Sequence, residues 1–289
     1  MNRIHKILVA TDFSPASKHA LDHARALAAR MDAEVHVLSV HVEQGHLHGL
    51  ANFPNLNDIE EQLEERVRAR MQDFIADCGN NLIAEVVRDQ NEASAILRYA
   101  EHRGIDLIVM GTHGRSTIPR FFLGSVAAEI LRSAPMPVLV TGAGHAAAAM
   151  KTGRILVPVD FSDVSLDLLH HAAHLANTLD ATLDVVHVTD PQSLPRYYAR
   201  NFGEQQQRMA EQAMQKLTAA AALDVEYSTS VLTGKADDVI VDLAAARKHD
   251  LIFMASAGRS RLSQMLLGST ADRVIRKAPC PVLAWRAAG

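Results

Sequence analysis

The fold of this chain is decided by a stretch that occurs twice. Residues 7–17 read ILVATDFSPAS and residues 155–165 read ILVPVDFSDVS, with seven of eleven positions identical at an offset of 148. A second pair, LGSVAAEILRSAPMPVLV at 123–140 and LGSTADRVIRKAPCPVLA at 267–284, agrees at ten of eighteen positions at an offset of 144. Self-similarity over a normal domain length indicates a tandem duplication. We therefore predict two domains, at 1–145 and 150–289.

Each copy alternates short β-branched apolar runs with longer segments of helical period, a pattern typical of βαβ units in a parallel sheet. The predicted strands of the first copy are KILVAT, EVHVLSV, NLIAEVV, DLIVMG and PVLVT. Ser14 and Pro15 fit the N-cap and first residue of a helix that follows the first strand. The expected fold class is α/β, with one such sheet in each copy.

The composition excludes several classes of function. The 289 residues are 48% hydrophobic and have a net charge of −4. No basic stripe is present for a nucleic acid, and no segment reaches the roughly 20 apolar residues of a membrane span. We expect a cytoplasmic protein with no nucleic-acid or membrane partner. Cys78 and Cys280 are too far apart in sequence for a CxxC site and are expected to be buried and reduced.

The stretch VMGTHGRSTIPRFFLGSVAAEIL at 109–131 combines three glycines with the start of a helix. Gly111 and Gly114 allow positive φ and close backbone approach, and Gly124 with Ser125 places helix amides where they attract an anion. Asp12 ends the first strand and would face the same edge of the sheet. The spacing predicts a phosphate site that is not a Walker A loop. The alternative is that Gly111 and Gly114 only form a tight turn and that Gly124 packs a helix on the sheet.

At these residues the chain resembles the universal stress protein family. Gly111, Gly114 and Gly124–Ser125 match the family's motif G-x2-G-x9-G-[ST], and ILVATDFS and APMPVLV match its first and last strands. The resemblance implies a Rossmann-like five-stranded parallel sheet of order 3-2-1-4-5 in each half, and ATP as ligand. It places the adenine and ribose end near Asp12 and the backbone of Val40. The residues assigned to nucleotide binding are Ala10, Thr11, Asp12, Val40, Met110, Gly111, His113, Gly114, Arg115, Gly124, Ser125 and Val126.

The second copy departs from the motif at one glycine. Ala255 stands where the first copy has Gly111, and a Cβ there would narrow the approach and penalise positive φ by roughly 1 kcal/mol. We therefore expect ATP mainly in the first half. The second-half candidate site consists of Asp160, Gly258, Arg259, Gly268, Ser269 and Thr270.

Other groups give weaker signals. His41, His46 and His48 lie in the loop that we expect after the second strand, either as metal ligands or as solvated side chains, and we assign no metal site. No carboxylate pair or catalytic triad stands out. Mg²⁺ could accompany ATP through an acid such as Asp12.

The predicted function is a stress-response module in which nucleotide binding orders the loop at 112–123. A slow ATPase and a non-nucleotide small-molecule carrier or scaffold are the alternatives. Duplication also predicts an internal pseudo-dimer, joined through the final strands, with a homodimer left open.

Overall fold

The computed structural model describes residues 3–42, 56–78, 82–112, 123–142, 153–190, 199–256 and 267–287. The first half contains β1 (Lys6–Ala10), α1 (Pro15–Met31), β2 (Glu34–Val42), α2 (Leu56–Ile75), the 3-10 turn Ala76–Cys78, β3 (Leu82–Asp89), α3 (Glu92–Arg103), β4 (Leu107–Gly111), α4 (Ser125–Ser133) and β5 (Val138–Thr141). The second half contains β6 (Arg154–Pro158), α5 (Val164–Leu179), β7 (Thr182–Thr189), α6 (Ala199–Ala221), β8 (Tyr227–Thr233), α7 (Ala236–Ala246), β9 (Leu251–Ala255), α8 (Ser269–Lys277) and β10 (Val282–Trp285).

The ten strands form one sheet in the order β3-β2-β1-β4-β5-β10-β9-β6-β7-β8. Each half therefore has the predicted order 3-2-1-4-5, and its described strand pairs are all parallel. Strands β1 and β4 are neighbours, so their carboxyl ends lie together. This confirms the expected fold and places the predicted motif residues at one edge.

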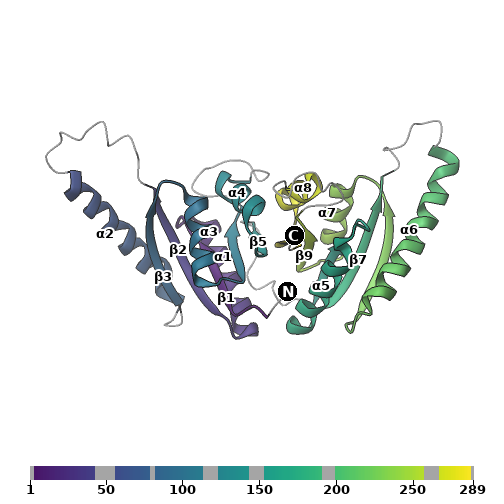
Figure 1. The fold of residues 1–289 in the computed structure, drawn as a ribbon, viewed down its shortest axis with the longest axis horizontal. Coiled ribbons are helices and arrows are strands. Elements are labelled where there is room, and N and C mark those ends of the chain that lie inside the picture. The colour runs from purple at the N-terminus through teal and green to yellow at the C-terminus, as the bar shows by residue number, and fades with distance from the viewer. Residues whose placement is uncertain are drawn as a thin grey trace.

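The two halves join through β5 and β10, the only antiparallel pair among the described strands. Leu139 pairs with Leu283, its own counterpart at an offset of 144, and Val140 pairs with Val282. A pseudo-twofold axis therefore passes between Leu139 and Leu283. Figure 1 shows the resulting arrangement, with α4 and α8 near the middle and α2 and α6 at the far ends. The predicted internal pseudo-dimer is confirmed.

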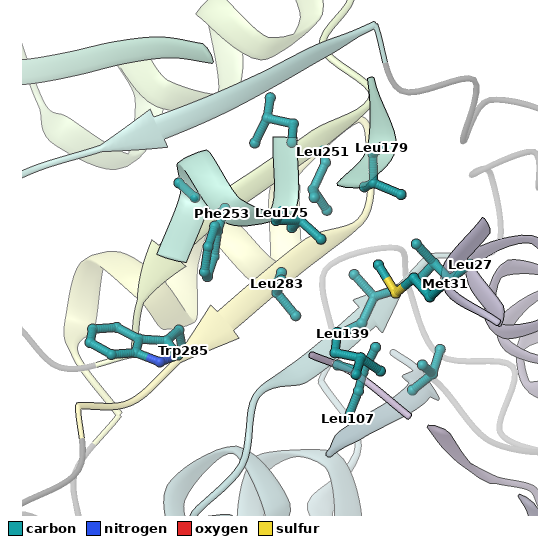
Figure 2. Close-up of a cluster of buried hydrophobic side chains, with 14 of the residues drawn as sticks. Leu27, Met31, Leu107, Leu139, Leu175, Leu179, Leu251, Phe253, Leu283 and Trp285 are labelled. Carbon is teal, nitrogen blue, oxygen red and sulfur yellow. The ribbon is translucent and has the colours of Figure 1, made fainter. Parts of the chain in front are cut away.

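The hydrophobic core continues across this junction. On one face of the sheet, the end of α1 contributes Leu27 and Met31, and α5 contributes Leu175 and Leu179 (Figure 2). Leu139 and Leu283 fill the space between them and are almost fully buried. A second buried cluster, on the other face, also draws on both halves. Because apolar burial is the main stabilising term, the junction is part of the core rather than a contact between separate domains.

Local details confirm one sequence prediction and correct another. Ser14 caps α1, because its side chain accepts a hydrogen bond from the amide of Ser17. His41, which we expected in a loop, lies within β2, which runs to Val42.

Cys280 is buried and unpaired, and burial raises the pKa of its thiol to about 12. Within the described parts of the chain, no helix is both long and apolar enough to span a bilayer.

Candidate functional site at the carboxyl edge of the sheet

A strained turn follows the first strand of each half. Phe13 and Phe161 have φ values of 65° and 58°, in the left-handed region that bulky residues rarely adopt. The preceding aspartate stabilises the turn in both halves, because Asp12 Oδ1 accepts from the Ser14 amide and Asp160 Oδ1 from the Ser162 amide, each at 3.0 Å. Such strain costs on the order of 1 kcal/mol and often marks a functional site. The turn holds each aspartate in a defined position at the edge.

The helices α4 and α8 begin at the same edge. Gly124 and Gly268 are their N-caps, and neither helix has a side-chain hydrogen bond at its cap. The amide of Gly124 donates to Thr112 O at 2.9 Å, and that of Gly268 to Ser256 O at 2.7 Å. Amides in the first turn of a helix have no intrahelical partner and attract anions. Both halves thus present a helix N-terminus beside an aspartate.

Gly111 has a packing role that the sequence analysis did not predict. Its φ is not positive, since Gly104 and Gly234 are the described glycines with positive φ. A Cβ on Gly111 would lie 3.0 Å from the carbonyl carbon, oxygen and Cβ of Ala16. Gly111 therefore lets α1 pack closely on β4, whereas the alternative interpretation had placed Gly111 in a tight turn and assigned helix packing to Gly124. The φ penalty expected for Ala255 is also wrong, because Ala255 lies in β9 with an ordinary φ.

Gly124 has no such packing role among the described residues. A Cβ there would come no closer than 3.6 Å to any described neighbour, the nearest atom being Thr112 O, and its φ is −60°. Alanine would fit this backbone without strain. The packing of the fold therefore does not account for a glycine at this position, whereas close approach of a ligand would.

In the second half, a cleft of about 400 Å³ opens at this edge between the ends of the strands and the starts of α5, α7 and α8. Four residues of the predicted second-half site line the cleft: Asp160, Gly268, Ser269 and Thr270. Val188, the counterpart of Val40 at an offset of 148, also lines it. Gly258 and Arg259 lie outside the described residues. The described residues of the predicted second-half site therefore line the cleft.

Ser256 is a lining residue that the sequence interpretation missed. It follows β9 directly and is only 2% exposed, yet its Oγ forms no hydrogen bond with any described residue. Buried hydroxyl groups are usually hydrogen-bonded, so either a polar ligand group or an ordered water would satisfy Ser256 here. A polar residue after the fourth strand of both copies, Thr112 and Ser256, was the signal available in the sequence.

An aromatic wall distinguishes the second-half cleft. The ring of Phe161 stacks on His187, with centroids 4.1 Å apart, and His187 lines the cleft. The Nδ1 of His187 lies 2.8 Å from Val159 O. Because a carbonyl oxygen only accepts, Nδ1 bears the hydrogen. In the first half Ser39 takes the place of His187, and Phe13 packs edge-on against Phe74 instead.

The predicted first-half residues lie on β1, β2, β4 and α4. Parallel pairing of β1 with β2 and β4 brings the carboxyl ends of these strands to one edge. Thr11 is used within the turn, because its Oγ1 accepts from the Phe13 amide and lies 2.9 Å from Ser17 Oγ. The described members of the predicted set are Ala10, Thr11, Asp12, Val40, Met110, Gly111, Gly124, Ser125 and Val126. His113, Gly114 and Arg115 lie outside the described residues, as do His46 and His48.

The described part of the chain contains no group of three or more His, Cys, Asp or Glu side chains close enough to hold a metal ion. A single carboxylate, Asp160, lines the second-half cleft. Mg²⁺ is commonly held by one or two carboxylates together with substrate phosphates. One aspartate therefore fits a metal that arrives with a nucleotide better than a dedicated metal site.

The fold and this edge define a tandem α/β protein with two Rossmann-like halves and a candidate ligand site at the carboxyl ends of its strands. A family model described as the Universal stress protein family matches residues 3–142 and 151–286. The chain belongs to that family.

Individual relatives agree with this assignment. The chain is 25% identical to the Universal stress protein E homolog of Haemophilus influenzae, over 97% of each protein. It shares its fold with a crystal structure of a universal stress protein from Pseudomonas aeruginosa, with a TM-score of 0.67, 21% identity and coverage of 98% of this chain and 93% of that one. A universal stress protein solved in complex with cAMP is 26% identical and covers 47% of this chain and 97% of its own, with a TM-score of 0.34. The cAMP is bound to that protein, and the similarity does not show which ligand this chain binds.

Proposed function

We propose that this chain binds ATP or a related nucleotide at the carboxyl edge of its sheet and acts as a nucleotide-responsive module in the stress response. The observation that supports the proposal most directly is the second-half cleft. It lies where the family motif predicts a ligand, and it is lined by a helix N-terminus, an aspartate and a buried hydroxyl in need of a partner.

The chemistry of the cleft suits a phosphorylated nucleoside. The amides of Ser269 and Thr270, at the start of α8, would bind a phosphate group, because the helix dipole favours negative charge there. Asp160 could accept from ribose hydroxyls or hold Mg²⁺ with the phosphates. The apolar side of the cleft, with Val188 and Met254, suits a base. Each of these groups lies on a helix or strand, or directly beside one.

The first half is proposed as the tighter site. It alone has all the glycines of the motif, and Gly124 is a glycine that the packing of the described residues does not require. The second-half cleft is proposed as a second site for a related ligand, since it is lined by Ala255 and by His187, where the first half has Gly111 and Ser39.

Calorimetric titration with Mg·ATP tests the proposal. We expect binding to the wild-type chain and at least about a tenfold loss of affinity at one site in Gly124→Ala, because the added methyl group would displace the phosphate from the helix amides. Gly268→Ala is the matched variant of the second half, and Ser256→Ala tests the buried hydroxyl. Absence of binding to the wild type at millimolar ATP would refute the proposal. So would binding that is unchanged when both glycines are replaced.

A response to the nucleotide has its own readout. A hydrogen bond from the Gly124 amide to Thr112 O joins the two ends of the loop at 112–123. We expect saturating ATP to slow hydrogen exchange at the amides of the loop at 112–123, since ordering of the loop by the nucleotide would protect them. Exchange that does not change while calorimetry shows binding would refute the switch and leave binding intact.

A further inference from the structure

A second cleft lies at the opposite edge of the sheet, between the two halves. Its volume is about 280 Å³, and it is lined by residues from three separate segments: Arg3, Ile4, Arg30, Met31, His174, Leu175 and Thr178. Arg3 and Ile4 precede β1, so this cleft lies at the amino end of the strands, away from the candidate nucleotide site. Arg30 and Met31 end α1, and the last three residues belong to α5.

The floor of this cleft is apolar. Ile4, Met31 and Leu175 are 4%, 5% and 3% exposed and belong to the core cluster that continues across the junction. Figure 2 shows Met31 of α1 and Leu175 of α5 within that cluster. A hydrocarbon placed on these side chains would extend an existing core, which is the main source of affinity in small-molecule sites.

The rim of the cleft is cationic. Arg3 and Arg30 are exposed, and neither lies within 4.0 Å of a carboxylate of the described residues. His174 adds an imidazole from the other half. Arg30 lies in the last turn of α1, where a cation complements the helix dipole. That explanation does not apply to Arg3, which lies outside any helix.

This chemistry is not a by-product of the duplication. At the offset of 148, the counterpart of Arg30 is Thr178 and that of His174 is Ala26. The counterpart of Arg3 is Lys151, another cation, so the duplication relates Arg30 to a neutral residue and Arg3 to a charged one. Each half supplies a different side of one asymmetric cleft.

We propose that this interhalf cleft binds a small carboxylate with a short alkyl chain. The carboxylate would accept hydrogen bonds from Arg3 and Arg30, since guanidinium groups match carboxylate geometry. The chain would lie on Ile4, Met31 and Leu175. Because these groups come from both halves, the ligand would bridge them and stabilise the folded chain.

Titration with octanoate, followed by calorimetry, tests this site in the full-length protein. We expect one equivalent to bind, and the double variant Arg3→Gln/Arg30→Gln to lose at least about tenfold in affinity. Arg25→Gln, on the same helix but outside the cleft, should bind as the wild type does. Octylamine has the same chain and the opposite charge and should not bind, and acetate should bind at least about tenfold more weakly.

Several results would overturn the proposal. They are no octanoate binding up to about 10 mM, equal affinity in the double variant and the wild type, or equal binding of octylamine. Thermal unfolding of each variant checks that it is folded. Because Arg3 and Arg30 are exposed, their replacement should leave the unfolding temperature close to that of the wild type. Competition by Mg·ATP would show that octanoate occupies the carboxyl edge instead, which would also refute the proposal.

Discussion

Two glycines of one sequence motif have different physical explanations. Gly111 is required by packing, since α1 lies against it, whereas Gly124 has room for a methyl group in the described structure. A motif search weighs them equally. The structure gives the first a packing role, and the second is the glycine that we propose for close approach of a ligand. Substitution by alanine is therefore predicted to destabilise the fold at Gly111 and to weaken ligand binding at Gly124.

Gly111→Ala should destabilise the chain by about 1–3 kcal/mol, because the new Cβ would press on the backbone of Ala16. Urea unfolding followed by circular dichroism measures this. Adding Ala16→Gly should restore only part of the loss, since the backbone carbon and oxygen of residue 16 stay in place. Gly153→Ala, with no described atom within 4 Å of its new methyl group, is the control. A Gly111→Ala protein as stable as this control would contradict the packing role.

At the scale of elements, the two halves hold their last helices differently. In the second half Asp237, at the start of α7, is 1% exposed and binds Lys277 at 2.9 Å and Arg273 at 3.2 Å, both on α8. Lys235 adds a third cation at 3.1 Å. At the offset of 144 the first half has Ala93, Glu129 and Ser133 instead. The second half therefore ties α7 to α8 by charge, close to the cleft that both helices border.

This ion cluster predicts a pH dependence of stability. Burial opposes ionisation of Asp237, but hydrogen bonds from Lys277 and Lys235 outweigh it and lower its pKa to about 2. A carboxyl with a lowered pKa stabilises the fold above its unfolded value of 3.8 and loses that contribution as the pH falls toward 2. Between about pH 5 and pH 2, the wild type should lose about 2 kcal/mol more than Asp237→Ala does.

Denaturant titrations of the two proteins at each pH provide the comparison. Asp238→Ala is the matched control, because Asp238 contacts the same lysines from a half-exposed position. Exposed ion pairs contribute little to stability, so this control should follow the wild type. If Asp237→Ala and the wild type lost stability in parallel, the buried carboxylate would not be the cause.

The helices and strands were predictable from the sequence, whereas the ion cluster around Asp237 was not. Strands such as KILVAT and DLIVMG were predicted to within a residue or two because continuous apolar runs are typical of buried parallel strands. Ser14 and Pro15 similarly predicted the start of α1. Asp237, Arg273 and Lys277 are far apart in the sequence, and ordinary charged residues give no signal that they will meet. Ser256 was missed for the same reason, since its burial depends on the packing around it.

At the scale of the whole molecule, one sheet and one continuous core join both halves. The duplication alone predicted the pairing of β5 with β10, because two equal halves pack through a shared edge. The cleft at the amino edge could not be predicted, since Arg3, Arg30 and His174 come from unrelated parts of the chain. The halves should therefore unfold together rather than one after the other.

Leu283→Ala tests this cooperativity. Leu283 is 3% exposed and faces Leu139 at the pseudo-twofold axis, so its truncation should cost about 3 kcal/mol. Trp285, the single tryptophan, lies two residues away on β10 and reports the junction by fluorescence, while circular dichroism reports every helix. The two transitions should coincide in the wild type and move together in the variant. Val231→Ala, on the distant strand β8, is the control. Separate transitions would show that the halves fold independently.

The claim on which the account depends most is that a nucleotide binds where α4 and α8 begin. Its most direct test is an NMR titration with Mg·ATP that follows the backbone amides of Ser125 and Ser269. We predict saturable shifts at these amides, first in the half that binds more tightly, with no change at Ile4 on the opposite edge. Signals of Ser125 and Ser269 that stay unchanged at saturating ATP would contradict the account.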